Sequence, residues 1–259
     1  MRINTNVIAL NSHRNLSMNT FNTSKNTERL SSGLRINRAA DDAAGLSISE
    51  VMRGQIRGLS QAQRNVQDGI SFVQTAEGAL NEVSAMLTRM KELNVQKDNG
   101  TYSDEDKKNI DSELDELGAQ IKEIMEKTTF NGINISPAAA AKINIVTDDT
   151  GSTIEIDTIN AADFNNLSKA NGRADIETAI KSVASERGTL GAKQNRLEYT
   201  SNNLGTTIEN LQASESRIRD TDMALEMMGF TKNNILTQAA TAMLAQANQL
   251  PQGVLQLIR

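Results

Sequence analysis

Several residue types on which many enzymes depend are absent from this chain or scarce in it. It has no cysteine, which excludes disulfides, thiolate zinc sites and thiol nucleophiles. It has no tryptophan, only 3% aromatic residues and two prolines in 259 residues. A core without aromatic side chains must be filled by aliphatic residues, methionine and alanine, as in helical bundles. Composition alone therefore predicts a mainly α protein.

Histidine, net charge and apolar runs limit the function further. We expect the one histidine, His13, to be a surface residue rather than a metal ligand or catalytic base, because it lies in an asparagine-rich stretch. The net charge of −5 argues against a nucleic-acid partner, which needs a basic face. No apolar run is long enough to span a membrane, and no ordinary secretory signal is visible. The simplest interpretation is a cytoplasmic protein, although a lack of cysteine is also compatible with export by another route.

Three stretches have apolar residues at steps of four and three, the spacing of a helix that packs along one seam. The first seam predicts a helix from about residue 41 to 96. The turn signal Asn99-Gly100 follows, and Ser103 with Asp106 predicts a capping box that opens a second helix. The longest seam runs on an unbroken rhythm over residues 176–225.

Glycines and one alternating segment interrupt this pattern. Gly188, Gly191 and Gly205 either allow close approach of a neighbouring helix or are simply tolerated. The segment INIVTDDTGSTIEIDTI (143–159) predicts the only β-hairpin, which must pack on the helices to be stable. Its Asp148-Asp149 pair is interpreted as a solvated turn rather than a calcium site, because the other oxygen ligands are missing. We therefore expect no metal and no cofactor.

Both ends of the chain are predicted to depend on association. Residues 234–259 are apolar on more than one face, and such a helix is buried or seeks a partner. The N-terminal stretch has an apolar face but many asparagines, which are poor helix formers. We expect both ends to be poorly ordered in the free monomer and to fold on association. Residues 30–49, LSSGLRINRAADDAAGLSIS, are interpreted as a joint between the N-terminal helix and the long helix after it.

Three motifs carry a resemblance to a known family. LSSGLRINRAADDAAGLSIS (30–49), RNVQDGISFVQTAEGALNEV (64–83) and MLAQANQLPQGVLQLIR (243–259) resemble bacterial flagellins. The resemblance covers roughly residues 1–136 and 174–259. It implies a structural subunit, not an enzyme, that polymerises into the flagellar filament for motility. The implied fold is a long antiparallel coiled-coil-like helix bundle, with paired N- and C-terminal helices and a small β-hairpin at the far end.

The resemblance also implies a domain organisation. Residues 1–40 and 226–259 correspond to the two helices of an inner-tube domain. Residues 41–136 and 174–225 correspond to the rod domain, with two helices from the first segment and one from the second. Residues 137–173 hold the hairpin and a short connection in place of the variable outer domains, so the chain is similar to a minimal flagellin.

Two sets of terminal residues are assigned from this resemblance and from the seams. The residues expected to pack in the filament core are Ile3, Val7, Leu10, Leu236, Ala240, Met243, Ala247, Leu250, Val254 and Leu257. The residues hypothesised to line a polar lumen are Gln246, Gln249, Gln252 and Gln256.

Location and partners follow from the same resemblance. The family is secreted through the flagellar type III export system and forms an extracellular filament. The implied partners are other copies of the chain in a helical homopolymer, an export chaperone, and the filament cap and hook–filament junction proteins. The stretch LTRMKELNVQ (87–96) resembles the primary contact of the host flagellin-sensing Toll-like receptor, with Arg89 and Leu93 as contacting residues and Glu116 as a third.

The sequence disfavours three other functions. An intracellular coiled-coil scaffold would share the seams but not the motifs at the ends. An enzyme using the carboxylates of Glu113 and Glu116 is disfavoured, because two acids three apart are ordinary on a solvated helix. A hook–filament junction protein would share the end helices, but the TAEGAL and LAQANQ segments favour flagellin.

Overall fold

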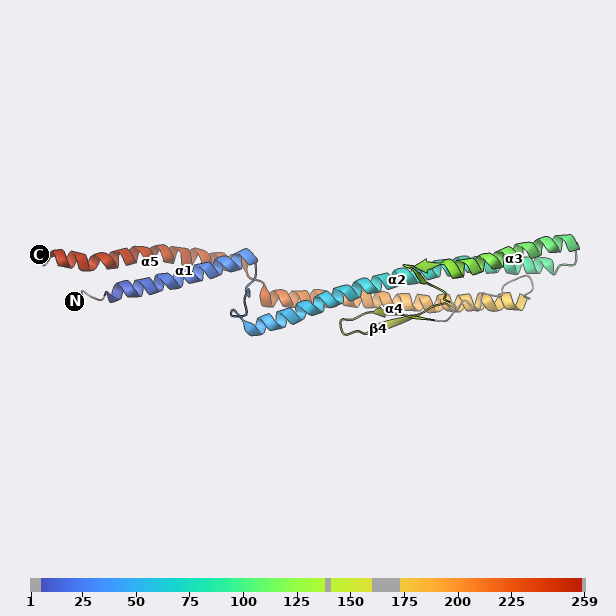
Figure 1. Ribbon diagram of the computed structural model, residues 1–259, viewed down its shortest axis with the longest axis horizontal. Helices are drawn as coiled ribbons and strands as arrows, with labels where there is room; N and C mark the ends of the chain where they lie inside the picture. Colours follow the sequence, from blue (N-terminus) through green and yellow to red (C-terminus); the bar gives the residue numbers. More distant parts are fainter. Residues whose placement is uncertain (1–5, 138–140, 160–172, 258–259) are drawn as a thin grey trace. The chain divides into compact units, whose positions relative to one another are not determined.

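The computed structural model describes residues 6–137, 141–159 and 173–257, with side chains described as far as residue 250. The helices are α1 (Val7–Ser32), α2 (Ala43–Lys97), α3 (Asp104–Lys127), α4 (Arg173–Arg219) and α5 (Met223–Leu257) (Figure 1). The strands are β1 (Thr129–Phe130), β2 (Ile133–Asn134), β3 (Lys142–Val146) and β4 (Thr153–Asp157). The protein is therefore mainly α, as its composition predicts.

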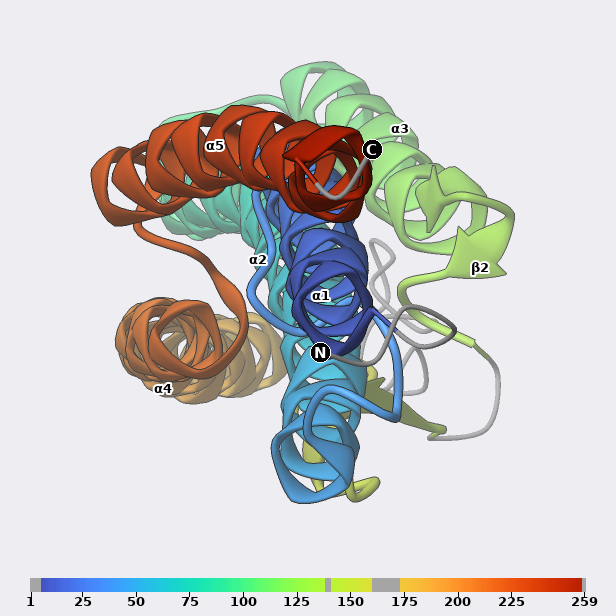
Figure 2. The ribbon, with the colours of Figure 1, turned by 90° about the vertical axis from the view of Figure 1, so that its left-hand side faces the viewer.

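The chain divides into two compact units. The terminal unit contains Met1–Gly54 and Asn210–Arg259, and the rod unit contains Gln55–Glu209. In the terminal unit α1 and α5 lie side by side (Figures 1 and 2). Contacts of Arg29 with Glu226 and of Asn6 with Ala247 show that the two helices are antiparallel. The predicted pairing of the terminal helices is confirmed.

The rod unit is built on one long stripe of buried residues along α2. Antiparallel partners flank this stripe: Lys91 pairs with Glu177 of α4, and Lys97 pairs with Asp111 of α3. The stripe repeats every seven residues, and its buried members are Leu59, Val66, Val73, Leu80 and Leu87. The buried residues of α4 repeat likewise through Val183, Leu190, Leu197 and Leu204. The heptad seams therefore mark the faces that the rod unit buries.

The predicted capping box opens α3. The Asp106 amide donates to Ser103 Oγ over 3.2 Å, and the Ser103 amide donates to the Asp106 carboxylate over 3.2 Å. The long seam is interrupted earlier than its rhythm predicts, because α4 ends at Arg219 and Asp222 caps α5. The Asp222 carboxylate accepts from the Ala224 amide over 2.9 Å. The Asp222 side chain thus begins a new helix within the stretch where apolar spacing alone predicts one continuous helix.

Both hairpins are antiparallel. The predicted one is confirmed: Ile143 pairs with Ile156, and Ile145 pairs with Ile154. The expectation that it is the only hairpin is wrong, because β1 and β2 pair around Asn131-Gly132. Both turn residues have positive φ, 49° and 79°, as a two-residue hairpin turn requires. The signal was visible as Asn-Gly, but the strands are only two residues long and lack a detectable alternation.

The β3–β4 hairpin packs along the side of α2 and α4 rather than at the far end of the bundle, where the resemblance placed it. A Cβ added to Gly69 would lie 2.1 Å from Ile145 Cδ1, and one added to Gly58 would lie 2.8 Å from Asp149 Cβ. Lys193 Nζ of α4 donates to the Glu155 carbonyl over 2.7 Å. In contrast, a Cβ on Gly188 or Gly191 would meet nothing within 4 Å. For those two, tolerance is the interpretation that fits, and a Cβ on Gly205 would meet only Gln63 Nε2, at an ordinary 3.7 Å. Gly58 and Gly69 are the α2 glycines that allow the hairpin to approach closely.

Gly69→Ala should detach or strain the hairpin, and Gly78→Ala is its matched control on the same helix. Both substitutions gain about 1 kcal/mol of helix propensity, but only the first places a methyl group against Ile145, since Gly78 has open space. Overpacking of this kind costs about 1–3 kcal/mol. We expect urea denaturation to show Gly69→Ala less stable than Gly78→Ala by about that amount. Equal stabilities would contradict this account of the close approach.

Candidate assembly surface

The face that α1 turns toward α5 is mostly small or polar. Half-buried α1 positions recur at steps of three and four, and they are Ala9, Ser12, Leu16, Asn19, Thr23, Asn26 and Leu30. The corresponding partly or fully buried positions of α5 are Glu226, Phe230, Asn233, Thr237, Ala240, Leu244 and Ala247. No described residue of α1 is fully buried. The α1–α5 pair therefore forms an interface that lacks a core of large, fully buried apolar side chains.

The contacts across this seam are correspondingly polar. Asn6 Nδ2 donates to the Ala247 carbonyl over 2.7 Å, and the Arg29 guanidinium lies 3.7 Å from the Glu226 carboxylate. A small groove between the helices is lined by hydroxyl and amide side chains, among them Thr23, Asn234 and Thr237. Such contacts fix register, but each hydrogen bond adds only about 1 kcal/mol.

Most large apolar side chains of α1 and α5 are exposed instead, whereas Leu16, Leu30, Phe230 and Leu244 lie half-buried on the seam between the helices. The exposed ones are between 41% and 69% exposed, and they are Val7, Ile8, Leu10, Met18, Phe21, Leu225, Ile235, Leu236, Met243 and Leu250, together with Met223, Met227 and Met228. Single exposed apolar residues are ordinary, but so many on two adjoining helices mark an interaction surface. We call this set the outer apolar face.

The structure separates the residues that the sequence placed on one packing seam. Val7, Leu10, Leu236, Met243 and Leu250 belong to the outer apolar face. Ala240 and Ala247 lie instead on the inner seam, and Ala247 is 3% exposed. Both α5 sets repeat every seven residues, so periodicity alone could not tell them apart. Ile3 and the side chains of Val254 and Leu257 lie outside the described residues.

The lumen hypothesis is only partly covered by the described side chains. Gln246 and Gln249 are both exposed on α5. The side chains of Gln252 and Gln256 lie outside the described residues.

The joint is a short, well-bonded connection. Gly33 ends α1 with φ 71°, a left-handed conformation that favours glycine. Beyond it the Arg35 amide donates to the Arg219 carbonyl over 2.7 Å, and the Thr221 amide donates to the Gly33 carbonyl over 3.0 Å. The two connections, one after α1 and one before α5, therefore pair like a minimal antiparallel ladder.

Ion pairs reinforce this joint. Lys25 lies 2.8 Å from Asp41, and Arg219 lies 2.6 Å from Glu50. The hydrogen bond from Lys25 lowers the pKa of Asp41 to about 2, and the amides of Asn37 and Arg38 donate to the same carboxylate. The hydrogen bond from Arg219 likewise lowers the pKa of Glu50. The charged forms of both acids are thus favoured in the folded terminal unit.

A second candidate site lies on the rod unit, where the sequence resembles a receptor contact. Arg89 is half-exposed and lies 3.0 Å from Glu113 and 3.4 Å from Glu92. The hydrogen bond from Arg89 to Glu113 raises the pKa of Arg89, so its charge is held firmly. Glu116 is exposed. Leu93, however, is only 2% exposed, because its side chain packs into the rod core, so it offers no accessible contact surface.

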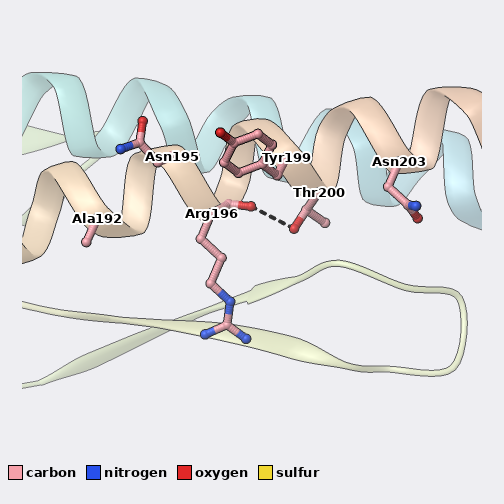
Figure 3. A pocket seen from close by; sticks show the side chains of 6 residues that line it. All are labelled: Ala192, Asn195, Arg196, Tyr199, Thr200 and Asn203. Carbon is pink, nitrogen blue, oxygen red and sulfur yellow. Dashed lines mark hydrogen bonds between the residues drawn. The ribbon is translucent and has the colours of Figure 1, made fainter.

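A shallow groove lies on α4. Figure 3 shows Arg196 extending from one side of α4 and Tyr199 from another, while Thr200 Oγ1 donates to the Arg196 carbonyl over 2.8 Å. Tyr199 is 77% exposed. Among the described residues, no carboxylate or histidine lines the groove, so they offer no acid–base pair there.

Within residues 6–137, 141–159 and 173–257 no group of three or more His, Cys, Asp or Glu side chains could hold a metal ion. None of the helices described there is both long and apolar enough to cross a membrane.

A two-helix terminal unit with an outer apolar face, joined to a helical rod, defines a helical structural protein rather than an enzyme. Two family models match the chain: the bacterial flagellin N-terminal helical region over residues 3–136 and the C-terminal helical region over residues 174–258. Together they cover more than half of it. The chain belongs to the bacterial flagellin family.

Individual relatives agree over the whole length. A flagellin of Halalkalibacterium halodurans is 50% identical, and the match covers 100% of both chains. A flagellar filament 33 kDa core protein of Treponema phagedenis is 46% identical, again over 100% of both chains. A solved structure from Vibrio parahaemolyticus, assigned as a flagellar hook-associated protein, is 15% identical, with a TM-score of 0.57 over 70% of this chain and 100% of that one. This last likeness supports the fold alone.

The ion pair at the joint predicts the titration of Asp41. A lowered pKa means that the pair stabilises the folded joint fully above the ordinary pKa near 3.8, and that this stabilisation is lost as the pH falls through about 2. We expect a carboxyl NMR titration of Asp41 to have its midpoint near 2. Lys25→Met should move that midpoint up toward 3.8, whereas Lys91→Met, whose partner Glu177 is in the rod unit, should not. A wild-type midpoint near 3.8 would refute the pairing.

Proposed function

We propose that this chain polymerises into the flagellar filament by burying its outer apolar face against other copies of itself. The observation that carries the proposal is the inverted burial of the terminal unit, which is polar between its helices and apolar outside them. Burying a large apolar side chain contributes about 1.5–3 kcal/mol. Several such side chains are exposed in the free chain, and their burial between subunits favours association.

The contact is open-ended rather than paired. The α1 and α5 parts of the outer apolar face differ in sequence. The α1 part of one copy can therefore contact the α5 part of another, so the contact need not join two identical surfaces. Contacts between unlike surfaces repeat from subunit to subunit, and they give an open helical filament when the rotation does not close. A filament, rather than a dimer or ring, is therefore the assembly that this surface suits.

We assign the parts of the chain to layers of that filament. Residues 1–40 and 226–259 form the inner tube, and residues 41–136 and 174–225 form the outer rod layer. Residues 137–173 take the place of the variable outer domains. Gln246, Gln249, Gln252 and Gln256 line a polar lumen, where unfolded chains can pass without sticking. The amides are uncharged and hydrophilic, which supports this role for the two whose exposure is described.

The filament position implies a route and further partners. The chain is secreted by the flagellar type III system and acts outside the cell. Before export, an apolar helix such as α5 requires a chaperone, because its outer side chains would otherwise aggregate. The filament cap and hook–filament junction proteins contact the two ends of the polymer through the same terminal surfaces.

A second proposed partner is the host flagellin-sensing Toll-like receptor. Its support is the motif at residues 87–96 and the exposure of Arg89 and Glu116 on the rod unit. Arg89 is held by two carboxylates, so its guanidinium is positioned before binding. Because Leu93 is buried, its role is to pack the helix beneath Arg89 rather than to touch the receptor.

Assembly is tested by adding purified chain to sheared filament seeds and measuring filament length by electron microscopy. We expect the full chain to elongate the seeds and a chain lacking residues 1–40 to leave them unchanged. Leu10→Ser with Leu236→Ser should slow elongation by at least about tenfold, because every 1.4 kcal/mol of lost contact is a factor of ten. Gln238→Ser, at an exposed polar position of α5, is the matched control and should have a smaller effect. Elongation by the truncated chain would show that the rod polymerises alone.

Receptor binding is tested on the monomer with the immobilised receptor ectodomain. Arg89→Ala should weaken the affinity by about tenfold or more, since arginine is a frequent interface hot spot. Arg64→Ala is the control on the same helix, because among the described residues that guanidinium bonds Gln61 alone. An unchanged affinity for Arg89→Ala would remove the receptor contact from this position.

A further inference from the structure

The methionines of this chain differ widely in exposure. In the rod unit Met90 is 0% and Met125 is 3% exposed, and Met86 is half-buried, as is Met52 in the terminal unit. The described methionines that are 47–64% exposed all lie on α1 and α5 of the terminal unit, and they are Met18, Met223, Met227, Met228 and Met243. Three of these stand within the first two turns of α5. We call Met223, Met227 and Met228 the methionine cluster.

The rest of the sequence leaves few competing targets for a mild oxidant. The chain has no cysteine and no tryptophan. The thioether sulfur is therefore the softest nucleophile that the protein presents. Its lone pair attacks one peroxide oxygen, the O–O bond breaks, and the departing hydroxide takes up the remaining proton. One methionine and one H₂O₂ give one sulfoxide and one water, with sulfur oxidised and peroxide reduced by two electrons.

Oxidation at this place has a specific consequence. The members of the cluster are 47%, 53% and 64% exposed, and Leu225, in the same two turns of α5, is 64% exposed. They belong to the outer apolar face, which subunit association would cover. A sulfoxide is polar and accepts hydrogen bonds, so burial against apolar side chains leaves it without a donor.

We propose that the methionine cluster is an oxidative modification site that controls subunit addition. Hydrogen peroxide converts the unassembled chain to a sulfoxide form that adds poorly to the filament, whereas subunits already in the filament are shielded. The inference rests on the proposed assembly through the outer apolar face. Because methionine sulfoxide is reducible, a methionine sulfoxide reductase with a dithiol restores the thioether, releasing water and leaving the dithiol as a disulfide.

The first experiment treats monomer and seeded filaments separately with dilute H₂O₂ and maps sulfoxides by peptide mass spectrometry. In the monomer we expect the cluster to oxidise well before Met90 and Met125. In the filament the cluster should oxidise at least about tenfold more slowly than in the monomer. Equal rates in the two forms would overturn the shielding, and early oxidation of the buried pair would overturn the site.

The second experiment measures elongation of sheared seeds by each chain, before and after treatment, with every rate divided by that chain's own untreated rate. Treated wild type should fall by about tenfold for each sulfoxide buried without a hydrogen-bond donor. Reductase treatment should restore it. The variant Met223→Leu/Met227→Leu/Met228→Leu should lose less of its rate than wild type, because only Met18 and Met243 of the outer apolar face remain to be oxidised and leucine matches methionine in volume and helix propensity. The control Met90→Leu/Met125→Leu should remain as sensitive as wild type.

The outcomes separate the two proposals. If untreated wild-type chain does not elongate the seeds, the assembly proposal fails. If it elongates but the cluster variant loses as much rate as wild type on treatment, the cluster is not the site. Loss of rate that the reductase cannot reverse would assign the damage to chemistry other than sulfoxide formation.

Discussion

The seam between α1 and α5 is the constraint on which the rest of the terminal unit depends. It is lined by alanine, threonine, asparagine and only a few large apolar residues, so closing it removes little apolar surface from water. Hydrophobic burial scales with that area. The pair therefore gains little stability from itself and keeps its large apolar side chains, such as Phe21 and Met243, on the outside. Stability has to come from neighbours, which makes folding of the ends and assembly one process.

A weak seam needs another means of setting register, and the joint supplies one. Backbone bonds connect Arg35 with Arg219 and Gly33 with Thr221, while ion pairs hold Lys25 to Asp41 and Arg219 to Glu50. These contacts are directional, unlike apolar packing. They align the start of α5 with the end of α1 in the folded pair. Polar contacts thus set the register of α1 against α5, whereas burial of the outer apolar face favours association with other copies.

Much of the fold could be predicted from the sequence, because the seven-residue spacing of apolar residues follows directly from the geometry of packed helices. That spacing could not orient α5, since Leu236 and Ala240 belong to two sets with the same seven-residue repeat. Only the position of α1 decides which set is inside. The same limit explains Leu93: its motif was visible, but its burial depends on how α2 packs in the rod. The stop at Asp222 and the two-residue strands β1 and β2 depend on single side chains and turn dihedrals, which periodicity does not register.

The two units divide the requirements of a polymerising subunit. The rod unit buries complete stripes on α2 and α4, which give it a hydrophobic core of its own. The terminal unit leaves large apolar side chains exposed, and it carries methionine where copies of the chain would contact one another through the unlike surfaces of α1 and α5. Methionine suits this because its unbranched thioether adapts to irregular surfaces. In a chain without cysteine, the same thioether is the most oxidisable group, so adaptability at the assembly surface and sensitivity to peroxide arise from one side chain.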